Sequence, residues 1–172
     1  MNPGFANETK LLQVCYTFMN VKLLVFFLIV NFAALGIGGL FTNSGVVSQW
    51  YLQMNKAPWT PPGWVFGAAW TFIMICFSFY MTHLFNTNYS RNLIITLFTV
   101  QWILNVSWNI LFFKSHLTGL ALIGIALLFF TTIIYLTLSL KQQQVGQIVL
   151  ILPYVIWLSI AVSLNAYIVV KN

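Results

Sequence analysis

The sequence of 172 residues contains no aspartate and a single glutamate, Glu8. Paired-carboxylate catalysis, a Ser-His-Asp triad and Mg²⁺ or Ca²⁺ sites all require acidic side chains that this chain lacks. Carboxylate proton relays, which drive many transporters, are missing for the same reason. We therefore predict no classical catalytic residues, no required cofactor and no proton-driven transport.

Charge of either sign is scarce. Only 5% of the residues are charged, against roughly 25% in a typical soluble domain, and the mean hydropathy is +0.91. The cations form no run, so nucleic-acid binding is not expected. Each lies near the end of a hydrophobic stretch, where it can reach lipid headgroups. They are Lys10, Lys22, Lys56, Arg91, Lys114, Lys141 and Lys171.

Residues that bind metals are also few. Cys15 and Cys76 do not form a CxxC pair, so neither a disulfide framework nor a zinc site is indicated. His83 and His116 lie near the ends of hydrophobic segments. A histidine can ligate haem iron, but a position at the membrane interface is the favoured interpretation. We predict no metal site.

What the chain has in abundance is apolar sequence. Five segments are each about as long as the 20 residues that cross a bilayer as a helix. We expect an all-α membrane protein, a multi-pass bundle of five transmembrane helices in which short turns join antiparallel neighbours. Residues 1–20 lack the features of a secretory signal and are predicted to be an uncleaved extension with a short interfacial helix. The domain then covers 21–172, with helices at about 21–41, 62–84, 91–113, 120–140 and 146–170.

The connection over residues 42–61 is the longest and is rich in apolar side chains. Trp50, Tyr51 and Trp59 give it more apolar surface than a loop in water normally exposes. Two interpretations stay open. The loop either folds back over the bundle as a lid, or it lies in the interface as an aromatic belt.

Polar and aromatic residues share one face of the third segment. Asn105, Trp108, Asn109 and Phe112 follow the i, i+3, i+4, i+7 spacing of a helix. An asparagine in a membrane needs partners, which a neighbouring helix, water or a ligand can supply. Contact between helices and ligand binding are both consistent with this stripe.

The fifth segment has a matching stripe. Pro153 frees a carbonyl one turn earlier, and Trp157 is followed four positions later by the small Ala161. With Trp70 of the second segment, these residues predict a site with flat aromatic walls, a few amide donors and no fixed charge.

Three ordered motifs resemble the translocator protein and tryptophan-rich sensory protein (TspO/MBR) family. Residues 56–63 (KAPWTPPG) followed by Trp70 resemble its W-x-P-P signature. Residues 101–113 (QWILNVSWNILFF) resemble the third-helix motif, and residues 152–165 resemble the fifth. The similarity covers about 20–170.

The resemblance implies five transmembrane helices, a homodimer and a ligand cavity closed by the first loop. It implies a membrane receptor or binding protein for porphyrins such as protoporphyrin IX and haem, with a tetrapyrrole-linked stress or regulatory role. The implied location is the cell membrane of a bacterium or the mitochondrial outer membrane of a eukaryote. Residues that match the family's cavity are Tyr51, Trp70, Asn109, Phe112, Trp157 and Ala161.

Alternatives remain within the same family. Some members are reported to degrade porphyrin under light, and a transporter of porphyrin or sterol is the other alternative. Leu164, Tyr167 and Lys171 fit the loose cholesterol-contact pattern. However, this chain has Val162 and Ala166 where many members have threonine and an aromatic residue. Sterol binding is therefore not assigned.

Overall fold

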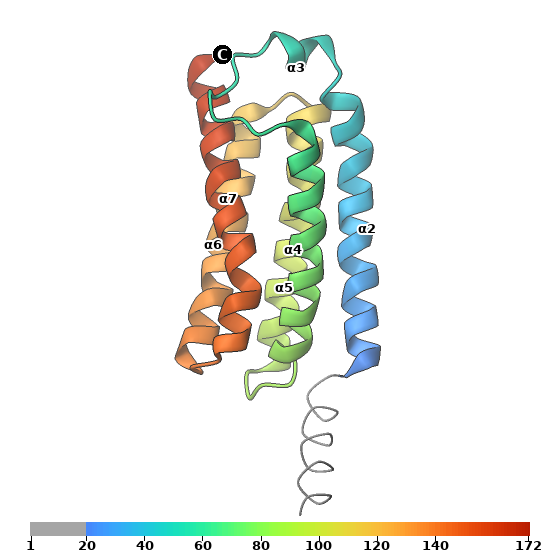
Figure 1. The fold of residues 1–172 in the computed structure, drawn as a ribbon, viewed down its shortest axis with the longest axis vertical. Helices are drawn as coiled ribbons and strands as arrows, with labels where there is room; N and C mark the ends of the chain where they lie inside the picture. The colour runs from blue at the N-terminus through green and yellow to red at the C-terminus, as the bar shows by residue number, and fades with distance from the viewer. Residues whose placement is uncertain (1–19) are drawn as a thin grey trace, which may run out of the picture.

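A computed structural model describes residues 20–172, which form five long helices, a short helix and a π-helical turn (Figure 1). The predicted all-α class is confirmed, since the described part contains no strand. The predicted interfacial helix of the extension lies outside the described residues. The elements are α2 (Val21–Gly45), α3 (Gln49–Gln53), α4 (Gly63–Leu84), α5 (Arg91–Asn109), the π-helical turn η1 (Ile110–Lys114), α6 (Thr118–Lys141) and α7 (Val145–Lys171).

Within residues 20–172, five spans are long and apolar enough to cross a membrane, with α5 and η1 counted together. Large apolar side chains cover the outside of the bundle, among them Ile29, Phe130 and Val149. Helices satisfy their own backbone hydrogen bonds, so such a surface is compatible with lipid but not with water. The chain is an integral, multi-pass membrane protein.

The first long helix extends four residues beyond its predicted end. Residues 42–44 are polar and were expected to begin the loop. Instead, the Thr42 hydroxyl donates to the Gly38 carbonyl at 3.1 Å, and the Ser44 hydroxyl donates to the Leu40 carbonyl at 3.2 Å. A side-chain hydroxyl that donates to the carbonyl four residues earlier is compatible with a helix, even in apolar surroundings. Polar residues can therefore continue the helix here.

The third span ends in a π-helical turn that the sequence did not predict. The Ser115 N–H donates to the carbonyl of Ile110, five residues earlier, at 2.9 Å. A π turn inserts one extra residue and so changes where the following side chains point. Phe112 and Phe113 are consecutive, yet both are buried.

The five long helices form a closed ring in the order α2, α4, α7, α6, α5. This corrects the expectation that every pair of sequential helices would be neighbours. The turn between α4 and α5 is short, but their backbones do not pack directly. Aromatic side chains meet between them instead, with Phe77 and Phe98 rings 6.2 Å apart.

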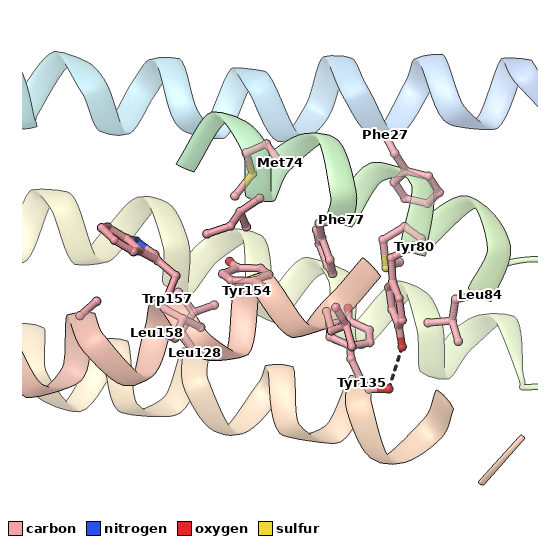
Figure 2. Close-up of a cluster of buried hydrophobic side chains, with 14 of the residues drawn as sticks. Phe27, Met74, Phe77, Tyr80, Leu84, Leu128, Tyr135, Tyr154, Trp157 and Leu158 are labelled. Carbon is pink, nitrogen blue, oxygen red and sulfur yellow. Dashed lines mark hydrogen bonds between the residues drawn. The ribbon is translucent and has the colours of Figure 1, made fainter. Parts of the chain in front are cut away.

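The larger of two buried clusters extends from the start of α2 and the end of α4 to the middle of the bundle (Figures 1 and 2), and a smaller one, around Phe112 and Phe113, lies at the other end. In the larger cluster, the hydroxyls of the buried Tyr80 and Tyr154 have partners, whereas that of Tyr135 has none in the described part of the chain. The Tyr80 hydroxyl donates to the Tyr135 carbonyl at 2.7 Å and lies 3.0 Å from the Ser139 hydroxyl. The Asn31 amide donates to the Ser78 hydroxyl at 2.9 Å, which joins α2 to α4. These bonds fix helix registers in a core that is otherwise apolar.

The end of α2 packs closely against the π turn and gives a test of the fold. A Cβ added to Gly45 would lie 2.6 Å from the Phe113 Cβ, whereas one added to Gly119 meets nothing within 4 Å. We predict that Gly45→Ala lowers the free energy of unfolding by about 1–3 kcal/mol, and that Gly119→Ala does not. Thermal unfolding in detergent, followed by circular dichroism, measures both. Equal stability of the two variants would contradict this packing.

Candidate functional site

A cavity of about 550 Å³ lies at the end of the bundle where the first loop crosses from α2 to α4. Its lining comes from α2, the first loop, α4, α5, η1 and α7. The volume is within the roughly 300–1,000 Å³ of small-molecule sites. The cavity is therefore large enough for an organic ligand.

The first loop lies across this end of the bundle, as the lid interpretation predicted (Figure 1). The Trp50 ring stacks on His116, with centroids 3.9 Å apart and an angle of 10°. The Trp59 Nε1–H donates to the Ser163 hydroxyl at 3.2 Å, and the Asn55 N–H donates to the Asn172 side-chain oxygen at 2.9 Å. The loop is thus tied to η1 on one side and to α7 on the other.

Five of the six predicted site residues line this cavity. They are Tyr51, Trp70, Asn109, Phe112 and Ala161. The sixth, Trp157, is not part of the lining. It is 7% exposed, packs edge-on against Phe66 at 5.3 Å, and lies in the core cluster one turn from Ala161 (Figure 2). Its Nε1–H has no partner in the described part of the chain. Trp70 and Trp157 do not face each other across the cavity.

Asn109 holds helices together at the cavity wall. Its side-chain oxygen accepts from the Thr42 hydroxyl at 2.7 Å, and its nitrogen donates to the Asn105 carbonyl at 3.0 Å. The helices approach closely here, because a Cβ on Gly38 would lie only 2.7 Å from the Asn109 nitrogen. Of the two interpretations of this stripe, the observed bonds match contact between helices.

Asn105 has a free and buried side-chain amide in the cavity. Its side chain is 6% exposed, lines the cavity and makes no hydrogen bond to any described residue. Trp108, by contrast, donates its Nε1–H to the Asn165 side-chain oxygen at 3.0 Å, and Asn165 donates to the Thr118 carbonyl. Trp108 and Asn165 are held in place, whereas Asn105 can bond to a ligand.

The cavity also contains a charge, which corrects the expectation of a site without one. Lys56 lies in the lining, with its Nζ 4.4 Å from the centroid of the Tyr51 ring. Burial raises the pKa of the Tyr51 phenol above its usual 10, so the ring stays neutral at physiological pH. The contact is therefore a cation–π interaction rather than an ion pair. The KAPWTPPG motif included Lys56, but nothing in its spacing indicated which way the side chain turns.

The two histidines lie at opposite ends of the bundle. His116 is stacked on Trp50 near the cavity, whereas His83 lies in the last turn of α4. They cannot share a metal ion. No group of three or more histidine, cysteine or acidic residues is found in residues 20–172.

Comparison with known proteins agrees with the motifs around this cavity. The sequence model of the TspO/MBR family matches residues 26–171. The chain belongs to this family. It is 27% identical over 158 residues to the tryptophan-rich protein TspO of Chlorobaculum tepidum, covering 90% of this chain and 99% of that protein. Identity to the protein of the same name from Archaeoglobus fulgidus is 31% over 143 residues, covering 81% and 90%. The translocator protein of Bos taurus is 28% identical over 135 residues, covering 75% and 78%.

The two asparagines of this family member should differ in their effect on stability. We predict that Asn109→Ala lowers the free energy of unfolding by about 1 kcal/mol, because it breaks the hydrogen bond from Thr42 that joins α2 to α5 and a second bond to the Asn105 carbonyl within α5. Asn105→Ala removes no bond and should change stability much less. Thermal unfolding of both variants without ligand is the measurement. A larger loss for Asn105→Ala would mean that the roles are reversed.

Proposed function

We propose that the chain is a membrane receptor or binding protein for porphyrins, protoporphyrin IX and haem among them, and for related flat hydrophobic ligands. As a porphyrin-binding protein, the chain would have a regulatory or stress-related role linked to tetrapyrroles. The observation that carries the proposal is a covered cavity that combines aromatic walls with one cation. A porphyrin has the same two parts, a flat apolar ring and carboxylate side chains.

The aromatic part of the cavity suits a planar ring. Trp108 and Phe112 are stacked, with centroids 5.5 Å apart and an angle of 24°, and Trp70 lines the same cavity. Large aromatic faces bind other ring systems by burial and stacking. Asn105 adds a free amide that can bond to a ligand oxygen or ring nitrogen.

Lys56 and the loop supply the polar end. The Lys56 side chain is half-buried, so its ammonium is close to water and can pair with a carboxylate at the mouth of the cavity. The homodimer implied by the resemblance remains a prediction.

Light-dependent degradation of porphyrin is a second candidate, favoured by one observation. Trp70 and Trp108 place readily oxidised indoles in the cavity lining. Trp157, the indole of the fifth-segment stripe, does not line the cavity. Transport of porphyrin or sterol remains a third prediction, with no structural feature that favours it.

The role of Lys56 can be tested with two forms of one ligand. We predict that Lys56→Met weakens binding of protoporphyrin IX about fivefold, since a half-buried ion pair contributes on the order of 1 kcal/mol. Binding of the dimethyl ester, which has no carboxylate, should change little. Titration of tryptophan fluorescence measures both affinities.

Lys114→Met is the matched control. Lys114 belongs to the same end of the bundle, but its Nζ lies over the Phe41 ring at 5.6 Å and it does not line the cavity. This variant should bind both ligands as the unaltered protein does. The proposal for Lys56 fails if Lys56→Met weakens both ligands equally or neither.

A further inference from the structure

A second cavity, of about 530 Å³, lies at the opposite end of the bundle from the first. It opens between the turn that joins α4 to α5 and the turn that joins α6 to α7. Its lining combines polar side chains with Gly146 and the aliphatic Leu150, and it includes no lysine, arginine or acidic side chain. The polar side chains are those of His83, Asn86, Thr87, Asn88, Gln142, Gln144 and Gln147.

The helix carbonyls near this cavity are already used. Helices α4 and α6 both end here, and the last carbonyls of a helix normally lack partners within it. Local donors satisfy them in this case. The Asn86 side chain donates to the Thr82 carbonyl at 3.2 Å, and the Tyr89 hydroxyl donates to the Leu138 carbonyl at 3.1 Å. Backbone N–H groups of both turns bond to the carbonyls of Met81, His83, Leu84, Leu138, Ser139 and Leu140.

The helix amides at the same place are not used. Helix α7 begins here, and its first backbone bond runs from the Ile148 N–H to the Gln144 carbonyl at 3.0 Å. The three preceding N–H groups, of residues 145–147, have no bonding partner in the described part of the chain. The Gln144 side chain makes no capping bond either. This end of α7 therefore presents donors and a positive partial charge.

Gln147 independently indicates a ligand. It lines the cavity and is only 6% exposed, so its polar atoms are largely removed from water. Its side-chain oxygen accepts from the Ser139 hydroxyl at 3.3 Å. Its Nε2 donates to no described residue and is not among the fully buried side-chain atoms that lack a partner. This nitrogen is therefore open to the cavity and can donate to a group that occupies it.

The charges nearby have one sign. Arg91 begins α5 and Lys141 ends α6, so both lie at this end of the bundle. Residues 20–172 contain no acidic side chain. Free donors, adjacent cations and the lack of carboxylates in the described part all favour an anion.

We propose that this cavity is a second binding site, and that it takes a phosphate group, carried either by the headgroup of an anionic phospholipid or by a phosphate ester in solution. Amide N–H groups at a helix start are common phosphate ligands. The cavity lies at an end of the bundle, which is the depth of lipid headgroups. It is larger than a phosphate ion needs, and Leu150 gives it one apolar side.

Thermal unfolding in detergent tests the site with defined probes. Dioctanoyl phosphatidylglycerol should raise the unfolding midpoint saturably, at concentrations at least tenfold below those needed for dioctanoyl phosphatidylcholine. Glycerol 3-phosphate serves as the soluble probe. If it raises the unfolding midpoint as much as phosphatidylglycerol does, the ligand is a phosphate ester in solution. If it raises the midpoint less, the ligand is the lipid headgroup. Equal rises with the two lipids, or no saturable rise with any probe, would overturn the proposal.

Substitutions locate the effect. Gln147→Glu keeps the acceptor for Ser139 but replaces the free donor with a negative charge, so the apparent affinity for phosphatidylglycerol should fall at least tenfold. Lys141→Gln should lower it about threefold, and it remains informative if Gln147→Glu does not fold, because Lys141 is exposed. Matched controls at the other end, Gln53→Glu and Lys171→Gln, should leave the affinity unchanged. Equal losses in the controls would place binding elsewhere.

Discussion

In lipid hydrocarbon, a polar group must find its partner within the protein, and the rest of this structure depends on that constraint. It makes the backbone helical and gives most polar side chains of the core a partner, although the Tyr135 hydroxyl and the Trp157 Nε1–H have none among the described residues. Asn31 reaches Ser78, Gln101 donates to Tyr154 at 2.8 Å, and Tyr80 reaches a carbonyl of α6. Because these bonds join different helices, they determine the order and register of the ring as well as its stability.

The constraint weakens toward the two ends of the bundle, and both cavities lie there. At one end the first loop covers a cavity in which Asn105 has a free amide. At the other end Gln147 and the start of α7 have free donors. Groups that a fully packed interior would have satisfied remain available to ligands. The two cavities differ in chemistry, since aromatic walls dominate the first and amides the second.

Much of this could be predicted from the sequence, because hydropathy and helix length determine the number of spans. Of the six cavity residues that the family resemblance predicted, five line the cavity. The π turn, in which the consecutive Phe112 and Phe113 are both buried, could not be predicted because no local sequence motif indicates it. Likewise, the spacing of Trp157 and Ala161 places them on one face, but it does not show that Phe66 packs against the indole.

Which helices are neighbours in the bundle was harder to predict than where the helices lie in the sequence. A short turn between α4 and α5 suggests neighbours, but the aromatic side chains between them keep their backbones apart. The direction of Lys56 also depends on how the loop folds back onto the bundle. The sequence of the loop alone could not predict the direction of this side chain.

The central claim is that the first loop covers a porphyrin in the cavity beneath it. Hydrogen exchange of the backbone amides, measured by mass spectrometry with and without saturating protoporphyrin IX, tests this most directly. Because a bound ligand would hold the loop against η1 and α7, exchange should slow over residues 42–61 and stay unchanged in the turn at residues 85–90. Unchanged exchange over 42–61 at full occupancy would contradict the account.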